Sequence, residues 1–316
     1  MVTALRSEVV RRFRAMNTEV EVVVVTGTAR ATAAAEAFER VEALFHDTES
    51  RLSRFLPSSE LCALNATAGH AFAASPVLFA AVSAAIDAAR TTLGLFDPTI
   101  LDALVAAGYD RSFELLPPDR MGTPTPPGSG PDWSAIALDA ATRTILLPMG
   151  CSIDLGGIGK GLTLDRSAAL LGRFRDFAID AGGDMVLAGT QADGSRWGVG
   201  VQDPTSPSCD LTRLECTDCA VATSTIARRH WLKGSRPQHH LIDPRTGLPS
   251  ESGAVATTVI ARSAAQAETL AKAALLLGPS AGIRFLDGQP NVEGLVVLEG
   301  GYVQRSAGLD GLLLVA

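Results

Sequence analysis

Strand-like and helix-like segments of this chain fall into separate runs, and this grouping limits the possible folds more than any other feature. β-branched or alternating apolar stretches predict strands, and apolar residues at helical spacing predict helices. The predicted strands are residues 20–25, 144–147, 177–180, 185–188, 197–202, 211–216, 254–261, 295–299, 302–305 and 312–315. The predicted helices are residues 32–55, 76–94, 162–174 and 264–277. A doubly wound sheet would alternate the two types, so we predict an α+β fold with mixed or antiparallel sheets and packed helices.

The length and composition fit one domain with a sizeable core. The chain has 316 residues, of which 47% are hydrophobic and 19% charged, so it can bury a core and little of it is expected to be disordered. We predict a single domain over residues 1–316, with residues 1–12 flexible. Residues 117–131 hold six of the 17 prolines, which predicts an exposed loop inserted within that domain.

The charge and hydropathy patterns argue against two classes of partner. The net charge of −7 disfavours nucleic acid, which binds a basic face. No apolar stretch approaches the roughly 18 residues that span a membrane, so we expect no membrane insertion. Arg11-Arg12 could be mistaken for a twin-arginine signal, but the next apolar run, residues 20–25, is short and contains Glu21. With no signal peptide or lipobox in the sequence, we predict a cytoplasmic protein.

The cysteines give no strong signal. Their number is odd, at five, which does not suggest a disulfide framework. Cys216 and Cys219 have CxxC spacing, but no second such pair or histidine pair completes a zinc site. A loop with two reduced thiols is therefore favoured over zinc, and any further role of this pair stays open.

The segment from Ile153 to Leu162, IDLGGIGKGL, carries the clearest chemical signal. Four glycines fall within residues 156–161, and glycine lets the backbone approach a ligand closely. A helix is predicted to follow, so its free N–H groups would favour an anion, and Lys160 adds positive charge. The spacing matches neither a P-loop nor a Rossmann fingerprint. The segment predicts a pyrophosphate-binding loop; a plain strand-to-helix turn with a solvated lysine is the alternative.

Two histidines precede a well-defined turn late in the chain. His239 and His240 are followed by Asp243-Pro244-Arg245-Thr246-Gly247, which is strong turn chemistry. A histidine at a cleft edge has the near-neutral pKa that suits a base toward an incoming hydroxyl, and an ordinary strand histidine is the alternative. The residues alone predict only turns at 96–99 and 180–184.

Seven short segments, taken in order, resemble the motifs of the ApbE family of FAD:protein FMN transferases. They are residues 16–18, 59–65, 96–99, 154–161, 181–184, 222–224 and 240–247. Met16-Asn17-Thr18 looks like the family's Met-Gly-Thr, and the stretch from Ser59 to Asn65 is similar to its Ser-Glu-Leu-x-x-x-Asn. The resemblance extends from about residue 13 to residue 286. Each motif is weak alone, but seven in register are specific.

The resemblance implies an ApbE-like fold around one cleft, with FAD as donor substrate and Mg²⁺ at its pyrophosphate. FMN would pass to a threonine or serine hydroxyl of an acceptor flavoprotein, and AMP would leave. The FAD-binding residues implied by position are Met16, Phe55, Phe96, Asp97, Asp154, Lys160 and Ile242. Gly157 would offer its carbonyl to the metal. His240 would act as the base and Lys160 would stabilise the developing charge, so both are predicted catalytic residues.

The chain departs from the family at the metal. Members usually place an aspartate and, four residues later, a threonine on the late helix as magnesium ligands, and here these positions hold Glu268 and Lys272. Glutamate can bind a hard cation, whereas a lysine ammonium has no free lone pair. We expect Glu268 as a metal ligand and Lys272 in direct contact with the pyrophosphate, supplying part of the metal's charge. Weakened magnesium binding, or a plain surface ion pair, are the alternatives.

Two other functions remain open at this level. The altered metal position could leave a flavin-binding protein without transfer activity. Water could also replace the acceptor hydroxyl, which would make the protein an FAD pyrophosphatase that releases FMN and AMP.

Overall fold

Eight strands join into one antiparallel sheet at the centre of the protein, in the order β1-β2-β7-β8-β11-β16-β17-β18. The computed structural model describes residues 6–27, 30–117, 119–122, 132–206 and 208–313. The strands are β1 (Ser7–Ala15), β2 (Thr18–Thr26), β7 (Asp176–Ala181), β8 (Asp184–Ala188), β11 (Cys219–Thr225), β16 (Ala254–Ala261), β17 (Glu293–Leu298) and β18 (Val303–Arg305). Every neighbouring pair is antiparallel, so the sheet is of the type predicted from consecutive strands.

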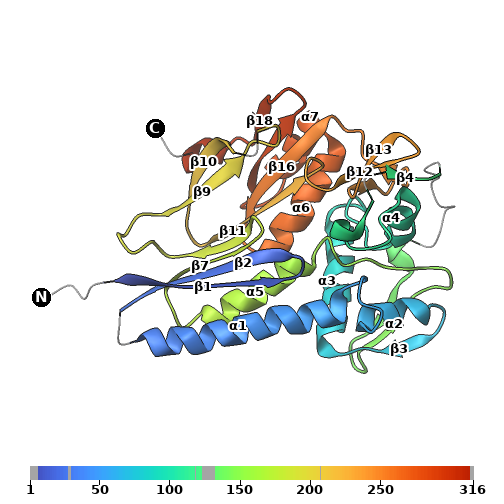
Figure 1. The fold of residues 1–316 in the computed structure, drawn as a ribbon, viewed down its shortest axis with the longest axis horizontal. Coiled ribbons are helices and arrows are strands. Elements are labelled where there is room, and N and C mark those ends of the chain that lie inside the picture. The colour runs from blue at the N-terminus through green and yellow to red at the C-terminus, as the bar shows by residue number, and fades with distance from the viewer. Residues whose placement is uncertain (1–5, 28–29, 118, 123–131, 207, 314–316) are drawn as a thin grey trace, which may run out of the picture.

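Both faces of this sheet are covered, which explains the nearly continuous valine run of β2. Val20, Val22 and Val24 pack against helices on one face, whereas Val23 and Val25 point to the opposite face, because side chains alternate along a strand. The helical face carries α1 (Ala31–Leu52), α5 (Gly159–Leu171), α6 (Ala264–Leu277) and α7 (Pro279–Asp287). The other face carries the hairpin of β9 (Trp197–Gln202) and β10 (Asp210–Cys216), as Figure 1 shows.

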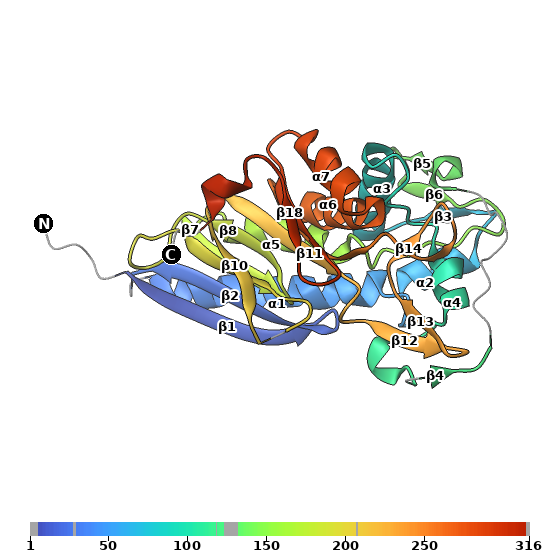
Figure 2. The same ribbon diagram turned by 90° about the horizontal axis from the view of Figure 1, so that it is seen from above.

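A smaller helical region lies at the end of the sheet opposite the two chain termini (Figures 1 and 2). It contains α2 (Glu60–Ala66), α3 (Pro76–Thr91) and α4 (Leu101–Ala107). The side chains of Ser59 and Ser75 accept hydrogen bonds from the first turns of α2 and α3, which fixes where these helices begin. Short strands complete the region: β3 (Ala71–Ala73), β4 (Asp119–Arg120), β5 (Ala137–Asp139), β6 (Thr144–Leu146), β12 (His230–Lys233), β13 (Arg236–His239), β14 (Ile242–Asp243) and β15 (Leu248–Pro249).

Two tight turns bring sheet ends and helix ends together beside this region. The β1–β2 turn has Met16 and Asn17 at positive φ, 50° and 60°, as a two-residue hairpin turn requires. The β7–β8 turn uses Gly182 and Gly183, and a side chain at Gly182 would collide with Thr18. The two turns are therefore in contact, and they form one wall of the candidate site.

Helices α5 and α6 cross closely at the glycine-rich segment. A Cβ atom at Gly161 would lie only 2.6 Å from Ala265 Cα, so only glycine fits at this crossing. The close approach places the side chains of α6 next to the start of α5. Gly161 is thus required for helix packing, a role that the sequence did not distinguish from ligand approach.

Most predicted elements are confirmed, and the α+β class with them. The strands at 197–202 and 254–261 and the helix at 264–277 have the predicted bounds. Helix α5 begins at Gly159, three residues earlier than predicted, and residues 309–312 form a 3-10 helix where a strand was predicted from residue 312.

The two ends of the chain and the proline-rich loop need separate mention. Residues 7–12, expected to be flexible, belong to β1. Residues 1–5, 314–316 and most of the 117–131 loop lie outside the described residues. Among the helices that are described, none combines the length and the hydropathy needed to cross a membrane.

Candidate functional site

Three adjoining cavities open where the sheet meets the smaller helical region. The first has a volume of about 100 Å³, the second about 420 Å³ and the third about 350 Å³. Gly156 and Arg229 line all three, so the cavities form one cleft. Each predicted site residue lines at least one of them: Met16, Phe55, Phe96, Asp97, Asp154, Gly157, Lys160, His240, Ile242, Glu268 and Lys272. Lys160 and His240 both line the third, so the predicted base and the predicted phosphate-binding lysine share a cavity.

Lys160 projects from the first turn of α5 and forms an ion pair with Asp184 of the β7–β8 turn. The second oxygen of Asp184 accepts a hydrogen bond from the backbone N–H of Thr223, at 3.1 Å. Burial lowers the pKa of Lys160 to about 8. The ammonium has three donors, so one ion pair leaves it able to bind a further anion.

The glycine-rich loop is less open to a ligand than the sequence predicted. The N–H of Gly156 donates to Asp154 Oδ2 at 3.2 Å, and the N–H of Gly161 donates to Glu268 Oε2 at 2.9 Å. Two backbone donors of the predicted pyrophosphate-binding loop are thus taken by carboxylates of the protein. Positive charge for an anion must come mainly from side chains in this cleft.

Arg54 follows the end of α1 and is clamped between two aromatic rings. Its guanidinium carbon lies 4.1 Å from the ring centroid of Phe55 and 4.6 Å from that of Tyr109, which is cation–π geometry. Its Nε donates to Asp154 at 3.2 Å, and its side chain is 7% exposed. The buried Nη2 has no hydrogen-bond partner among the described residues. Because such an atom costs free energy if it stays unpaired, Nη2 is suited to donate to a ligand in the cleft.

His240 and His239 have different surroundings. The Nε2 atom of His239 lies 3.0 Å from the carbonyl of Ser250, and its Nδ1 accepts from the N–H of Leu241. The buried Nδ1 of His240 has no partner within the described chain. Removal from solvent, with the charges of Arg229 and Lys272, holds the pKa of His240 well below its ordinary value. His240 is therefore neutral at pH 7 and has a nitrogen free to accept a proton.

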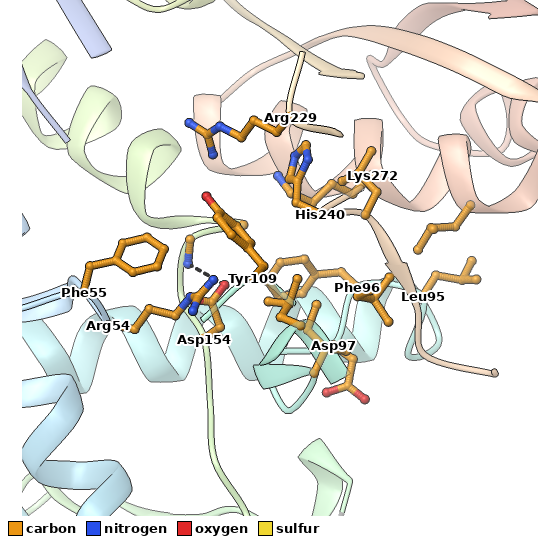
Figure 3. Close-up of a pocket in the computed structure, with 17 residues that line it drawn as sticks. Arg54, Phe55, Leu95, Phe96, Asp97, Tyr109, Asp154, Arg229, His240 and Lys272 are labelled. Carbon is orange, nitrogen blue, oxygen red and sulfur yellow. Dashed lines mark hydrogen bonds and ion pairs between the residues drawn. The ribbon is translucent and has the colours of Figure 1, made fainter. Parts of the chain in front are cut away.

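The cleft places its cations close to His240. In Figure 3, Arg229 and Lys272 lie on the same side as the imidazole, whereas the Arg54–Asp154 pair lies across the cavity. Arg229 takes part in none of the ion pairs formed by the described residues, although it lines all three cavities. The arrangement gives a pocket for a polyanion next to a neutral base.

The remaining predicted FAD-binding residues are less exposed to the cavities. Phe96 and Ile242 are buried, 5% and 2% exposed, and line the small first cavity. Asp97 holds the turn at 96–99 together, because its Oδ1 accepts from both the N–H and the hydroxyl of Thr99 at 2.7 Å. Burial raises the pKa of Asp97, and its carboxylate points away from His240 in Figure 3. Met16 lines the second cavity from the β1–β2 turn.

The donor set around Glu268 does not fit Mg²⁺. Its Oε2 accepts from Gly161 N–H, and its Oε1 lies 3.2 Å from the ammonium of Lys272. The aliphatic stem of Lys272 packs beside Gly157, since a Cβ there would lie 3.1 Å from Lys272 Cε. Mg²⁺ needs several oxygen ligands, yet the cation beside Glu268 Oε1 is the ammonium of Lys272, which has no lone pair to offer. The described residues also contain no cluster of three or more His, Cys, Asp or Glu placed to bind a metal.

Arg54, Tyr109 and Arg229 also line the cleft and were not identified from the sequence. Arg54 directly precedes Phe55, and Arg229 belongs to the Arg228-Arg229-His230 stretch after β11. Basic residues beside recognised motifs were the available signal. The fold brings them into the site from segments with no motif of their own.

Comparisons with known proteins give matches over most of the chain. The profile of the ApbE family matches residues 16–296. An FAD:protein FMN transferase of Treponema pallidum (strain Nichols) is 30% identical over 295 residues, covering 86% of this chain and 80% of that protein. One from Vibrio cholerae is 26% identical, with 77% and 74% covered.

Solved structures match nearly the whole chain. An ApbE protein of Thermotoga maritima superposes with a TM-score of 0.86 and 25% identity, over 98% of this chain and 100% of that one. The Pseudomonas stutzeri flavinyl transferase ApbE in its apo form gives 0.84 with 20% identity, over 100% of both chains. This second likeness concerns the fold alone.

Proposed function

Because the chain belongs to the ApbE family, we propose that it acts as an FAD:protein FMN transferase, as its relatives are named. FAD is the donor substrate, and a threonine or serine hydroxyl of a target protein is the acceptor. The phosphoester of FMN forms on that hydroxyl, the pyrophosphate bond breaks, and AMP leaves. The observation that carries this proposal is the single cleft that joins Lys160, Lys272 and Arg229 to the unpaired Nδ1 of His240.

The charges of the cleft suit the phosphate bridge of FAD. Lys160, Lys272 and Arg229 all line the third cavity, and ammonium and guanidinium groups are the usual protein partners of phosphate. The half-buried ring of Phe55 lines the first and second cavities and offers a packing surface for one of the two ring systems of FAD. Phosphoryl transfer depends chiefly on positioning and on stabilising charge, and these residues supply both.

His240 acts as the base in the proposed mechanism. Its neutral imidazole accepts the proton of the acceptor hydroxyl as the oxygen attacks the FMN phosphorus. Bound pyrophosphate offsets the charges of Arg229 and Lys272, which removes part of the cause that lowers the pKa of His240. Binding of the substrate thus strengthens the base that the reaction needs.

The expected Mg²⁺ is not part of this proposal, because the contacts of Glu268 and Lys272 do not fit it. The partner we propose is an acceptor flavoprotein with a reactive threonine or serine. The cytoplasmic location expected from the sequence stays a prediction.

Mass spectrometry of an acceptor protein tests the proposed function. The chain is incubated with FAD and an acceptor flavoprotein that was produced without its flavin. We expect a covalent flavin phosphate on the acceptor and one AMP released for each, and neither when the acceptor threonine is replaced by valine. Free FMN and AMP without modified acceptor would instead indicate a pyrophosphatase, and bound but intact FAD would indicate a binding protein.

A further inference from the structure

Lys272 lines the cleft beside Glu268, at the position where the family resemblance predicts a metal ligand. We propose that its ammonium replaces the metal, so that this chain binds and cleaves FAD without a divalent cation. The inference rests on the proposed function, because it concerns how the same cleft holds the same substrate. It adds a property that follows from this chain's own residues.

The first argument is that each carboxylate oxygen of Glu268 already has a partner within the protein. One carboxylate oxygen accepts from the backbone of α5 through Gly161, and the other faces Lys272 at 3.2 Å. The side chain is 4% exposed. Burial alone would raise the pKa of Glu268, but the charges of Lys272 and Lys160 together with the Gly161 N–H lower it. Glu268 is therefore an ionised carboxylate whose ion pair positions the ammonium of Lys272.

The second argument is the position of Lys272 itself. Glu268 and Lys272 lie four residues apart on α6, so both project from one face of that helix. Lys272 lines the first and third cavities, and its stem covers Gly157. His240 lines the same two cavities, and Figure 3 shows the Lys272 side chain beside its imidazole. One of the three donors of the ammonium meets Glu268, so two remain for phosphate oxygens.

The third argument is the balance of charge. The third cavity is lined by the cationic side chains of Lys160, Arg228, Arg229 and Lys272 and by two carboxylates, those of Asp184 and Glu268. Two positive charges are therefore in excess before any ligand binds. A divalent cation bound to Glu268 would have to displace the Lys272 ammonium or lie next to it. Two neighbouring positive charges in a buried site repel each other strongly. The Lys272 ammonium therefore supplies the positive charge that neutralises the pyrophosphate, and it opposes the binding of a metal ion.

FAD binding by the unmodified protein gives the direct test. The quenching of FAD fluorescence is titrated once with millimolar EDTA and once with millimolar MgCl₂. We expect dissociation constants that agree within about twofold, far less than the tenfold that corresponds to about 1.4 kcal/mol. FAD that binds about tenfold or more tightly with MgCl₂ overturns the inference while the proposed function stands. Failure to bind FAD in either buffer overturns both.

A matched pair of variants gives the second test. Lys272→Thr offers a hydroxyl oxygen that can ligate Mg²⁺, whereas Lys272→Met fills similar volume with no hard donor. In EDTA, both should bind FAD more weakly by about tenfold or more. MgCl₂ should restore affinity to Lys272→Thr and leave Lys272→Met unchanged. Wild-type affinity of either variant in EDTA, or no gain of Lys272→Thr with MgCl₂, contradicts the inference.

Folding of the variants is checked by the thermal unfolding midpoint, because loss of Lys272 leaves Glu268 buried beside Gly161. The unmodified protein needs no such check, so the EDTA comparison decides the question even if both variants unfold. Transfer to the acceptor in EDTA supplies a separate readout, and we expect it to equal transfer in MgCl₂.

Discussion

The ion pairs of the cleft and those of the edge strand β1 both join a basic side chain to a carboxylate, but in different surroundings. In the pair of Lys160 and Asp184, the side chains are 23% and 4% exposed; in the pair of Arg12 and Glu21 on β1 and β2, they are 75% and 39% exposed. The other cleft pairs are Arg54–Asp154 and Lys272–Glu268, and the other β1 pairs are Arg11–Glu42 and Arg14–Glu19.

This difference in burial indicates which charged side chains are held firmly enough to bind a phosphate. Exposed pairs exchange freely with water, and each contributes between zero and about 1 kcal/mol. A buried carboxylate, by contrast, fixes its cation at one position, because leaving either charge unpaired is costly. In the cleft, Asp184 and Glu268 therefore hold lysine ammonium groups where a phosphate can bind. On β1 the arginines decorate an edge strand and hinder edge-to-edge pairing.

The largest expected effect comes from His240, whose Nδ1 has no hydrogen-bond partner among the described residues. His240→Ala should reduce transfer of FMN by about 10²–10⁴-fold, since general base catalysis contributes that much. FAD affinity should change little. Turnover is measured by mass spectrometry of the acceptor, and affinity by FAD fluorescence.

His239→Gln is the control for that variant. His239 is hydrogen-bonded to Ser250 and lines none of the three cavities, so transfer should stay near that of the unmodified protein. Equal losses in the two variants would mean that His240 has no special part in the reaction.

Asp184→Asn tests the buried side of the comparison. The substitution keeps the shape of the side chain but leaves Lys160 without its ionic partner, and breaking a buried pair costs about 3 kcal/mol or more. Urea denaturation should show this as a lower free energy of unfolding. A Lys160→Met, Asp184→Asn double variant should recover part of the loss, and failure to recover any would deny the coupling between the two residues.

Arg54→Met should weaken FAD binding by about ten- to a hundredfold, because a hydrogen bond from a charged donor contributes about 1.5–3 kcal/mol. The argument is the unpaired Nη2 in the cleft. Arg54→Lys keeps the charge but not the planar fork, so it should recover only part of the affinity. If Arg54→Met bound FAD as tightly as the unmodified protein, Arg54 Nη2 would not donate a hydrogen bond to FAD.

Acidification should lower the free energy of unfolding through the buried His240 of the cleft, by a smaller amount than the substitutions above. Since the pKa of His240 is depressed in the folded protein, the unfolded chain binds a proton there as pH falls below about 6.5 while the folded chain does not. The free energy of unfolding then falls by up to about 1.4 kcal/mol per pH unit. His240→Gln should lose less stability than the unmodified protein between pH 7 and pH 5 in urea titrations, and equal losses would contradict the assignment.

The smallest effect is expected on β1. Arg12→Gln removes one partner of an exposed pair, so the free energy of unfolding should change by less than about 1 kcal/mol. Transfer and FAD affinity should be unchanged. A loss as large as that of Asp184→Asn would erase the distinction between the two regions.

Local patterns predicted the elements that have strong periodicity or clear caps. Helix α6 has the predicted bounds because Ser263 caps its first turn and apolar residues recur along its length. Strand β16 consists of β-branched residues and alanines over eight residues, a composition and length typical of strands. Strand β1 was missed because Arg11, Arg12 and Arg14 interrupt any apolar alternation, and its pairing with β2 supplies the stabilisation that its own pattern does not show.

The sequence predicted residues that form the site, but it did not predict the contacts between them. Motifs identified Lys160, His240 and Glu268 individually. The hydrogen bond from Gly161 to Glu268 joins residues 107 positions apart, and no local pattern reports such a contact. For the same reason, the sequence suggested a metal ligand at Glu268, whereas the fold shows a carboxylate already committed to α5 and Lys272.

A crystal structure of the protein with FAD tests the central claim most directly, because the claim is that one cleft holds the phosphate bridge beside the base. We predict the two phosphates within hydrogen-bond distance, about 2.7–3.2 Å, of the Lys160 and Lys272 ammonium groups, with the FMN phosphorus on the side that faces His240. FAD bound elsewhere, or with its phosphates away from both lysines, would contradict the account.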